Sequence, residues 1–256
     1  MVENHCRRMP DDPLRGSNHP ILGIIDKPPL LGYTMLRVLI IGNAPTEHLS
    51  QWSHLIKDSD LIIACDGALE TCRNSDISVD IVIGDMDSIS NEALEYAKSA
   101  GVEIVKLTDQ NNNDLSKAIN YANSLAATDI TIVNVDGGSS DHQFANYLSL
   151  IEAESTARLM LNDCIVSAVS NNKPLKYSIE IGTEFSLFSL GGCTGVELIG
   201  GKWQLENAEL EPSSMGLHNI AIADKLSVSC ASGHLLLFVS NSVSYTHLRA
   251  HETNVD

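Results

Sequence analysis

The chain has 256 residues, with a formal charge of −17 at pH 7 and a pI near 4.7. Nucleic-acid backbones are bound by clustered Lys and Arg side chains, so this composition argues against a nucleic-acid partner. No apolar stretch approaches the roughly 20 residues of a membrane span, and the first residues lack a continuous apolar segment, so we expect a cytoplasmic protein with no membrane partner.

The first part of the chain predicts an α/β domain. Residues 1–34 mix Pro, Asp, Asn and Gly without a sustained period, and we expect a disordered or non-native extension there. Apolar runs and helical stretches then alternate, with expected strands at 38–41, 61–65, 79–83, 102–107, 130–135 and 157–161 and expected helices at 47–57, 68–74, 90–99, 114–125 and 141–154. Strands separated by helices indicate right-handed crossovers and a mainly parallel, Rossmann-like sheet over residues 35–165.

The pattern changes after about residue 165. Short alternating runs, separated by Gly and Ser, occupy residues 178–181, 184–190, 196–199, 221–229 and 235–239. They predict a second domain, an antiparallel β sandwich or barrel, over residues 166–241. Residues 242–256 resemble the translation of a sequencing-library adapter, so we do not interpret His247 and His251 as a metal pair despite their i, i+4 spacing.

The most informative motif is Gly84-Asp85-Met86-Asp87-Ser88, which directly follows the apolar run 79–83. Mg²⁺ takes oxygen ligands, usually one or two carboxylates together with substrate phosphates, and Asp85 and Asp87 meet that need. In open α/β sheets, ligands bind outside the carboxyl ends of the strands, where this motif would lie. For the motif taken alone, a solvated Asp-rich turn is the alternative.

Three further acidic or glycine-rich clusters follow expected strands, namely Asp66-Gly67, residues 109–114 and residues 136–142. Parallel strands would place all of these loops at one edge of the sheet, where they can converge on one ligand. Gly137-Gly138 would let a phosphate approach the backbone, and a following helix N-terminus favours anions.

Each polar residue of these clusters also has a structural alternative. Asp66 could serve only as a turn former, and Asp114 and Asp141 could serve as helix N-caps, a role that does not exclude ligand binding. His142 could be a ligand contact or an ordinary helix residue.

The order of these motifs resembles that of the thiamine pyrophosphokinase family over about residues 36–240. The matching segments are Asp66-Gly67, Gly84-Asp85-Met86-Asp87-Ser88, Asp109-Gln110 with Asp114, Gly137-Gly138-Ser139-Ser140-Asp141-His142 with Asn146, and Gly201-Lys202-Trp203-Gln204-Leu205 with Asn207, Ser213-Ser214 and Asn219. Three positions depart from the family pattern: Ser139 replaces an Arg, Asn113 replaces a Thr, and Ala68 replaces a common Gly. The missing Arg would remove a phosphate-pairing cation, for which Lys117 or Lys202 could compensate.

The resemblance implies transfer of a pyrophosphoryl group from ATP to the hydroxyl of thiamine, giving thiamine diphosphate and AMP, with Mg²⁺ as cofactor. On this reading Asp85, Asp87 and Asp114 are catalytic metal ligands, Asp66 is a further ligand, and Asp85 or Asp87 is the general base. The implied ATP-binding residues are Asp66, Gly67, Ser88, Gly137, Gly138, Asp141 and His142. The implied thiamine-binding residues are Gln110, Trp203, Ser214 and Asn219.

Trp203 has a physical reason to bind thiamine, because a pyrimidine and a cationic thiazolium stack well on an indole. The alternative is a core tryptophan of the β domain. The resemblance also implies a homodimer in which the β domain of one subunit supplies Trp203 to the site of the other.

Two other functions are compatible with parts of the sequence. An apolar strand followed by Asp-x-Asp is also typical of haloacid-dehalogenase-type phosphohydrolases, although the later Lys and distal acidic pair of that class lack a suitable context here. A non-catalytic thiamine- or nucleotide-binding sensor is the other alternative, supported only by Ser139.

Overall fold

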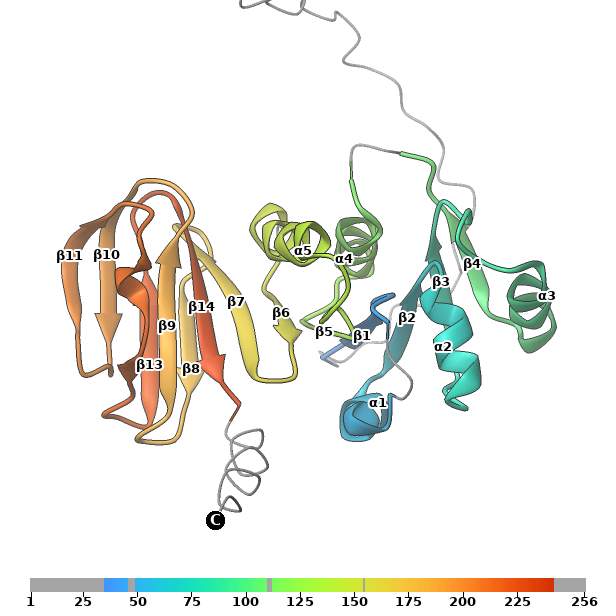
Figure 1. Ribbon diagram of the computed structural model, residues 1–256, viewed down its shortest axis with the longest axis horizontal. Helices are drawn as coiled ribbons and strands as arrows, with labels where there is room; N and C mark the ends of the chain where they lie inside the picture. The colour runs from blue at the N-terminus through green and yellow to red at the C-terminus, as the bar shows by residue number, and fades with distance from the viewer. Residues whose placement is uncertain (1–34, 46–48, 110–111, 154, 242–256) are drawn as a thin grey trace, which may run out of the picture. The chain divides into compact units, whose positions relative to one another are not determined.

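The computed structural model describes residues 35–45, 49–109, 112–153 and 155–241, which lie in the compact unit that begins at Met35 (Figure 1). The expected extension at 1–34 and the expected adapter-like tail at 242–256 lie outside the described residues, as do His247 and His251. Within the described ranges, no helix is both long enough and apolar enough to cross a membrane.

The α/β region contains six parallel strands in the order β6-β5-β1-β2-β3-β4. These strands are β1 (Arg37–Ile41), β2 (Leu61–Cys65), β3 (Ile81–Gly84), β4 (Glu103–Lys106), β5 (Asp129–Val133) and β6 (Ala157–Met160). The helices between them are η1 (Ser50–Trp52), α1 (Ser53–Asp58), α2 (Ala68–Asn74), α3 (Asn91–Ala100), α4 (Asp114–Ser124) and α5 (Ser140–Glu152).

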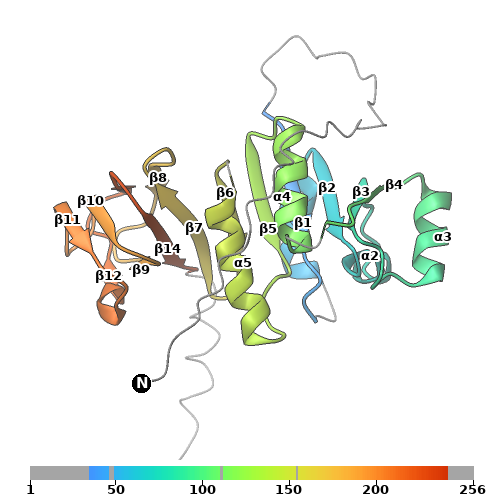
Figure 2. The same cartoon turned by 90° about the horizontal axis from the view of Figure 1, so that it is seen from above.

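The alternation of side chains along β1 explains why helices cover both faces of this sheet. Val38 and Ile40 belong to the buried cluster that includes α4 and α5, whereas Leu39 and Ile41 belong to the cluster that includes α2 and α3. Because a parallel strand buried on both faces reads as a continuous apolar run, β1 has no polar alternation. Figure 2 shows α4 and α5 side by side on one face, in agreement with their direct contacts.

The β region continues the same sheet with antiparallel strands and adds a second sheet. Strands β7 (Cys164–Ser170), β14 (His234–Ser240), β9 (Glu184–Ser189) and β12 (Asn219–Ile220) extend the first sheet to ten strands. Strands β11 (Leu205–Leu210), β10 (Cys193–Ile199), β13 (Lys225–Ser229) and β8 (Leu175–Ser178) form the second sheet. Side chains of both sheets share one buried cluster, so the predicted fold class, an α/β region followed by an antiparallel sandwich, is confirmed.

Some elements differ from expectation. The expected strand at 178–181 is wrong, because the residues that pair are those of β8, Leu175–Ser178. Of the expected run 221–229, only β13, Lys225–Ser229, pairs continuously with neighbouring strands. Strand β11 was not expected; it lies at a sheet edge, where few of its side chains are buried and the apolar period is weak. Strand β7 was also not expected, and the predicted boundary at 165/166 falls inside it.

Candidate functional site

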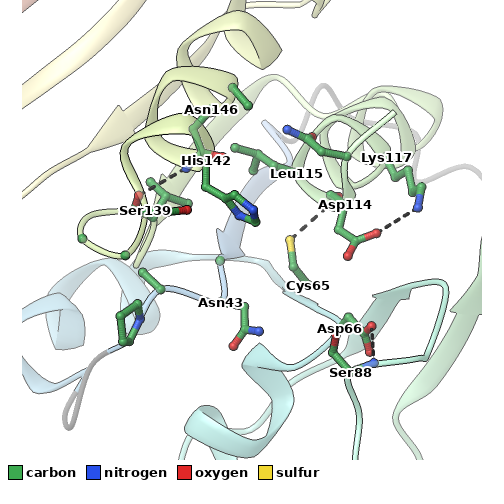
Figure 3. Close-up of a pocket in the computed structure, with 18 of the residues that line it drawn as sticks. Asn43, Cys65, Asp66, Ser88, Asp114, Leu115, Lys117, Ser139, His142 and Asn146 are labelled. Atoms are coloured by element: carbon green, nitrogen blue, oxygen red, sulfur yellow. Dashed lines mark hydrogen bonds and ion pairs between the residues drawn. The ribbon is translucent and has the colours of Figure 1, made fainter. Parts of the chain in front are cut away.

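A pocket of about 560 Å³ lies at the carboxyl ends of the parallel strands (Figure 3). It is lined by the loops that follow β1, β2, β3 and β5 and by the first turns of α4 and α5. The strand order reverses between β1 and β5, and this is the position at which open α/β sheets form their ligand crevice. The expected convergence of strand-end clusters on one pocket is therefore confirmed for the loops that the structure describes.

Three carboxylates meet beside this pocket; Asp66 and Asp85 line it, whereas Asp87 does not. Asp66, Asp85 and Asp87 each offer an oxygen, and these oxygens lie within 4.8 Å of one another. Asp66 is only 2% exposed; its Oδ2 accepts a hydrogen bond from Ser88 N at 3.2 Å, whereas its buried Oδ1 has no hydrogen-bond partner among the described residues.

The backbone between β3 and α3 is shaped to bring these carboxylates together. A Cβ on Gly84 would lie 2.8 Å from the Cβ of Asp66, so only glycine allows the two loops to approach this closely. Met86 has a φ of 65°, a left-handed conformation that costs a non-glycine residue roughly 1–3 kcal/mol. This turn lets Asp87 N donate to Asp85 Oδ1 at 3.2 Å, while Ser88 Oγ donates to Asp87 Oδ1 at 2.9 Å.

Burial raises the pKa of Asp66, and the nearby carboxylates of Asp114, Asp85 and Asp87 add to this effect, although the Ser88 N–H opposes it. The Asp87 N–H, in contrast, holds the pKa of Asp85 below its usual range. A buried, unpartnered carboxylate oxygen beside two further carboxylates fits a hard divalent cation such as Mg²⁺. Two oxygens on opposite sides of Mg²⁺ are about 4.2 Å apart, so small side-chain rotations would allow all three residues to bind one ion.

Asp114 lines the same pocket but lies outside this three-carboxylate cluster. Its Oδ1 accepts a hydrogen bond from Lys117 Nζ at 2.9 Å, and the Lys117 side chain is 7% exposed (Figure 3). Lys117 is the only Lys or Arg among the described pocket residues. The pocket therefore has a positively charged side chain, that of Lys117, although Ser139 occupies the position of the Arg in the family pattern.

The N-caps of both pocket helices differ from the alternatives considered. Asn113, not Asp114, caps α4, since its Oδ1 accepts from Ser116 N at 2.7 Å. Asn and Thr are both favourable N-cap residues, so Asn113 keeps the capping ability of the Thr in the family pattern. The N-cap position of α5 is Ser139, and Asp141 lies in the first turn, where a hydrogen bond with the Ser139 side chain lowers its pKa.

The loop before α5 leaves room for a ligand. Gly137 and Gly138 have φ values of 88° and 80°, and a Cβ on Gly137 would have no atom within 4 Å. Ser139 and His142 line the pocket beside them, whereas Asp141 does not. Gly67 does not line the pocket either; it lies against Asn43, whose Nδ2 would be 2.5 Å from an added Cβ.

The expected thiamine-binding residues that the structure describes, Trp203, Ser214 and Asn219, do not line this pocket. Trp203 is 54% exposed, so it is not a core residue, and Lys202 Nζ lies 4.7 Å from its ring centre. Asn219 is buried; its Oδ1 accepts from Trp203 N at 3.1 Å and its Nδ2 donates to Trp203 O at 2.8 Å. Ser214 lies in the exposed turn η2 (Ser214–Gly216), and Gln110 lies outside the described residues.

Sequence reasoning missed the loop after β1 as part of the site. Asn43 lines the pocket, and the buried Asn134 supports this loop by donating from Nδ2 to Gly42 O at 2.7 Å and to Ala44 O at 3.2 Å. The strand-end rule that found the other clusters could also have found Gly42-Asn43. Cys65 lines the pocket as well, but burial raises its pKa strongly, so its thiol stays protonated and is not a nucleophile.

One protein-family model matches the central part of the chain. Residues 52–161, which contain most of the pocket loops, match the family model described as thiamin pyrophosphokinase, catalytic domain. This part of the chain is similar to the catalytic domain of thiamine pyrophosphokinases.

Thiamine pyrophosphokinases of other organisms are similar to this chain in sequence and in fold. The chain is 29% identical over 163 residues to thiamine pyrophosphokinase 2 of Oryza sativa subsp. japonica, covering 58% of this chain and 61% of that protein. It is 25% identical over 168 residues to thiamine pyrophosphokinase 1 of Arabidopsis thaliana, covering 60% and 62%. The matches thus span about three fifths of these plant thiamine pyrophosphokinases.

The crystal structure of thiamine pyrophosphokinase from Bacillus subtilis has the same fold. It superposes with a TM-score of 0.68 at 20% identity, covering 80% of this chain and 99% of that one. The yeast thiamin pyrophosphokinase structure superposes with a TM-score of 0.63 at 15% identity, covering 82% and 87%. Because these superpositions cover most of this chain, the shared fold includes residues of the β region beyond the matched catalytic domain.

Proposed function

We propose that this protein is a Mg²⁺-dependent thiamine diphosphokinase, which transfers a pyrophosphoryl group from ATP to thiamine. The observation that carries the proposal is the cluster of Asp66, Asp85 and Asp87, with its unpartnered buried oxygen. Asp66 and Asp85 of this cluster line the pocket that also contains the Gly137-Gly138 loop. Carboxylates that hold a cation and open backbone that receives phosphates are the two requirements of phosphoryl transfer from a nucleotide.

The polyphosphate of ATP would lie between these two groups. Asp66, Asp85 and Asp87 would hold Mg²⁺, with Asp114 as a further ligand, and the ion would neutralise charge on the phosphate oxygens. Lys117 would bind a phosphate oxygen, because it is the cation that the pocket retains. The backbone at Gly137 and Gly138 would allow phosphates to approach the first turn of α5, where free N–H groups favour anions.

The reaction forms a bond between the thiamine hydroxyl oxygen and the β-phosphorus, and it breaks the bond from that phosphorus to the oxygen it shares with the α-phosphate. AMP leaves, and the hydroxyl proton passes to a carboxylate. We assign this proton transfer to Asp87. Asp85 Oδ1 accepts a hydrogen bond from Asp87 N, which stabilises the charged form of Asp85 and suits it to remain a charged ligand.

Thiamine would bind through a second subunit. Trp203 is exposed and does not line the pocket of its own chain, and Met215 and Leu217 beside η2 are 90% and 50% exposed. We therefore propose a homodimer in which Trp203 stacks on thiamine at the partner's pocket, with Ser214 nearby and Asn219 holding the Trp203 backbone. The cytoplasmic location remains a prediction from the sequence.

A product assay tests the proposal. Purified protein, ATP and Mg²⁺ should yield AMP and thiamine diphosphate only when thiamine is added, and a chelator of divalent cations should stop the reaction. Release of inorganic phosphate without thiamine would instead favour a phosphohydrolase. Tight thiamine binding without AMP would favour the sensor.

A further inference from the structure

Buried polar residues join the two helices that bound the pocket. Asn113 and Ser116 lie at the start of α4, and Ser149 lies on α5, one turn after the pocket residue Ala145. Ser116 and Ser149 are 4% and 2% exposed, although the neighbouring contacts of both helices are apolar. We call Asn113, Ser116 and Ser149 the α4–α5 polar junction.

The hydrogen-bonding capacity of the Ser149 hydroxyl is fully used at this junction. Asn113 Nδ2 lies 3.1 Å from Ser149 Oγ, and Ser116 Oγ lies 2.9 Å from it. Ser149 Oγ is also 3.1 Å from Ala145 O. A hydroxyl has one donor and two acceptor sites, so Ser149 can accept from Asn113 and Ser116 while it donates to the Ala145 carbonyl.

The Asn113 side-chain amide faces both helices. Its Oδ1 accepts from Ser116 N at 2.7 Å and lies 3.2 Å from Ser149 Oγ, an alternative acceptor for that hydroxyl, while its Nδ2 lies 3.1 Å from the same Ser149 Oγ. The helix cap of α4 is therefore tied directly to α5. Glu152 Oε2, also on α5, lies 3.2 Å from Ser116 Oγ and is a competing acceptor. Whether the Ser116 hydroxyl donates to Ser149 or to Glu152, the hydrogen bond links α4 to α5.

The junction adjoins the pocket groups that would hold ATP: Asn113 lines the pocket, and Ser116 and Ser149 do not. Asn113 is adjacent to Asp114, and Lys117 is one residue after Ser116, so the start of α4 carries both the junction and this ion pair. On α5, the first turn contains His142 and the free N–H groups that would favour the phosphates of ATP. Apolar helix contacts tolerate small sliding movements, whereas directional hydrogen bonds fix one register.

We infer that Ser149 is a positioning residue for the proposed transfer reaction, holding the Asp114–Lys117 pair of α4 in register with the phosphate-binding end of α5. This inference rests on the proposed function. Because a misplacement of about 1 Å can reduce a rate about a hundredfold, the hydroxyl should affect the chemical step more than the binding of thiamine, whose proposed site lies elsewhere.

The experiment compares Ser149→Thr with Ser149→Val. The two side chains have nearly the same size, so both add equal crowding at a buried position, but only Thr keeps the hydroxyl. Ser149→Val should have a kcat about ten- to a hundredfold below that of Ser149→Thr, with equal KM for thiamine. Calorimetry without turnover should show α,β-methylene-ATP with Mg²⁺ binding about five- to tenfold more weakly to Ser149→Val.

The matched control is Ser170→Thr against Ser170→Val. Ser170 is also buried, in the β region, and its hydroxyl donates to Asn172 Oδ1 at 2.7 Å, but it does not line the pocket. This pair should differ in stability without differing in kcat or in nucleotide affinity. If neither Ser149 variant folds, Ser116→Ala serves instead, because Ser116 does not line the pocket and the variant removes only its hydroxyl contacts to Ser149 and Glu152; it should lower kcat and nucleotide affinity in the same direction.

The outcomes separate the inference from the proposed function. Active wild-type protein with equal kcat and equal nucleotide affinity for Ser149→Thr and Ser149→Val would overturn the inference alone, as would a Ser170 pair that differs as much as the Ser149 pair. Wild-type protein that makes no AMP with thiamine would overturn the proposed function, and the inference with it.

Discussion

Replacing Asp66 by Asn should stabilise the metal-free protein and abolish its activity. Asp66 is buried beside two other carboxylates, and its Oδ1 has no hydrogen-bond partner among the described residues. In Asp66→Asn, the amide oxygen can still accept from Ser88 N. The amide NH₂ would face the carboxylates of Asp85 and Asp87 as a donor, so an unfavourable contact becomes a favourable one.

The size of the effect follows from the unpartnered oxygen. A buried acceptor without a partner costs about 1–3 kcal/mol, and an ionised one costs more. Removing this cost should raise the free energy of unfolding by about 1–3 kcal/mol. For a domain of about 200 residues, each kcal/mol corresponds to a rise in Tm of about 2–4 °C.

Thermal unfolding with a chelator and with Mg²⁺ measures both consequences. The wild type should gain about 2.7 kcal/mol when Mg²⁺ is present at about a hundred times its Kd, whereas Asp66→Asn should lose most of this gain. Asp224→Asn makes the same chemical change at an exposed residue outside the pocket and should leave both measurements unchanged. If Asp66→Asn unfolds at a lower temperature than the metal-free wild type, or keeps the full Mg²⁺ effect, the metal-site reasoning is wrong.

The pH dependence of the difference has a defined sign. The pKa of Asp66 is raised in the folded state, so its ionisation destabilises the metal-free fold at neutral pH. This destabilisation begins as the pH rises above the ordinary Asp value of about 3.9, and it is complete above the raised pKa. The Tm advantage of Asp66→Asn over the wild type should therefore shrink as the pH falls toward about 4. An advantage that grows on acidification would contradict the assignment of the shift to burial.

Three further substitutions test the remaining roles. Asp87→Asn should abolish AMP formation and leave the Tm within about 2 °C of the wild type, because it removes a ligand with little change in volume; wild-type rates would exclude Asp87 from the site. Lys117→Met should raise the KM for ATP by about ten- to a hundredfold, as expected for a lost charge-assisted contact, and should leave the KM for thiamine unchanged. Trp203→Ala should weaken thiamine binding, measured by calorimetry, about ten- to a hundredfold more than ATP binding; equal losses would make Trp203 a structural residue.

The parallel half of the fold was predictable because its strands are buried on both faces. The run Val38–Ile41 is entirely apolar, so it is readily recognised as a buried strand. Both β2 and α2 begin and end at the expected residues. The β region was harder to predict. Strand β8 has no fully buried residue, since half-buried and exposed side chains alternate along it. Its expected position was three residues too late, because turn residues near 179–182 also alternate in polarity.

The site was predictable where it depends on position along a strand. Asp66, Asp85 and Asp87 each follow a strand end, so the parallel topology alone brings them together. The detailed contacts were not predictable. The unpartnered Oδ1 of Asp66 and the ion pair of Lys117 depend on burial and on the register between α4 and the sheet, which local patterns do not specify.

The position of β14 in the large sheet determines the order in which the chain can fold. Strand β14 is formed by the last described residues, yet it is an interior strand that pairs with β7 on one side and β9 on the other. During synthesis, β7 and β9 therefore emerge before the strand that joins them, and they remain unpaired edges until residue 240 has left the ribosome. The parallel strands β1 to β6 need no later segment for their pairing. The protein should thus complete its parallel α/β half first and add the sandwich in one late step.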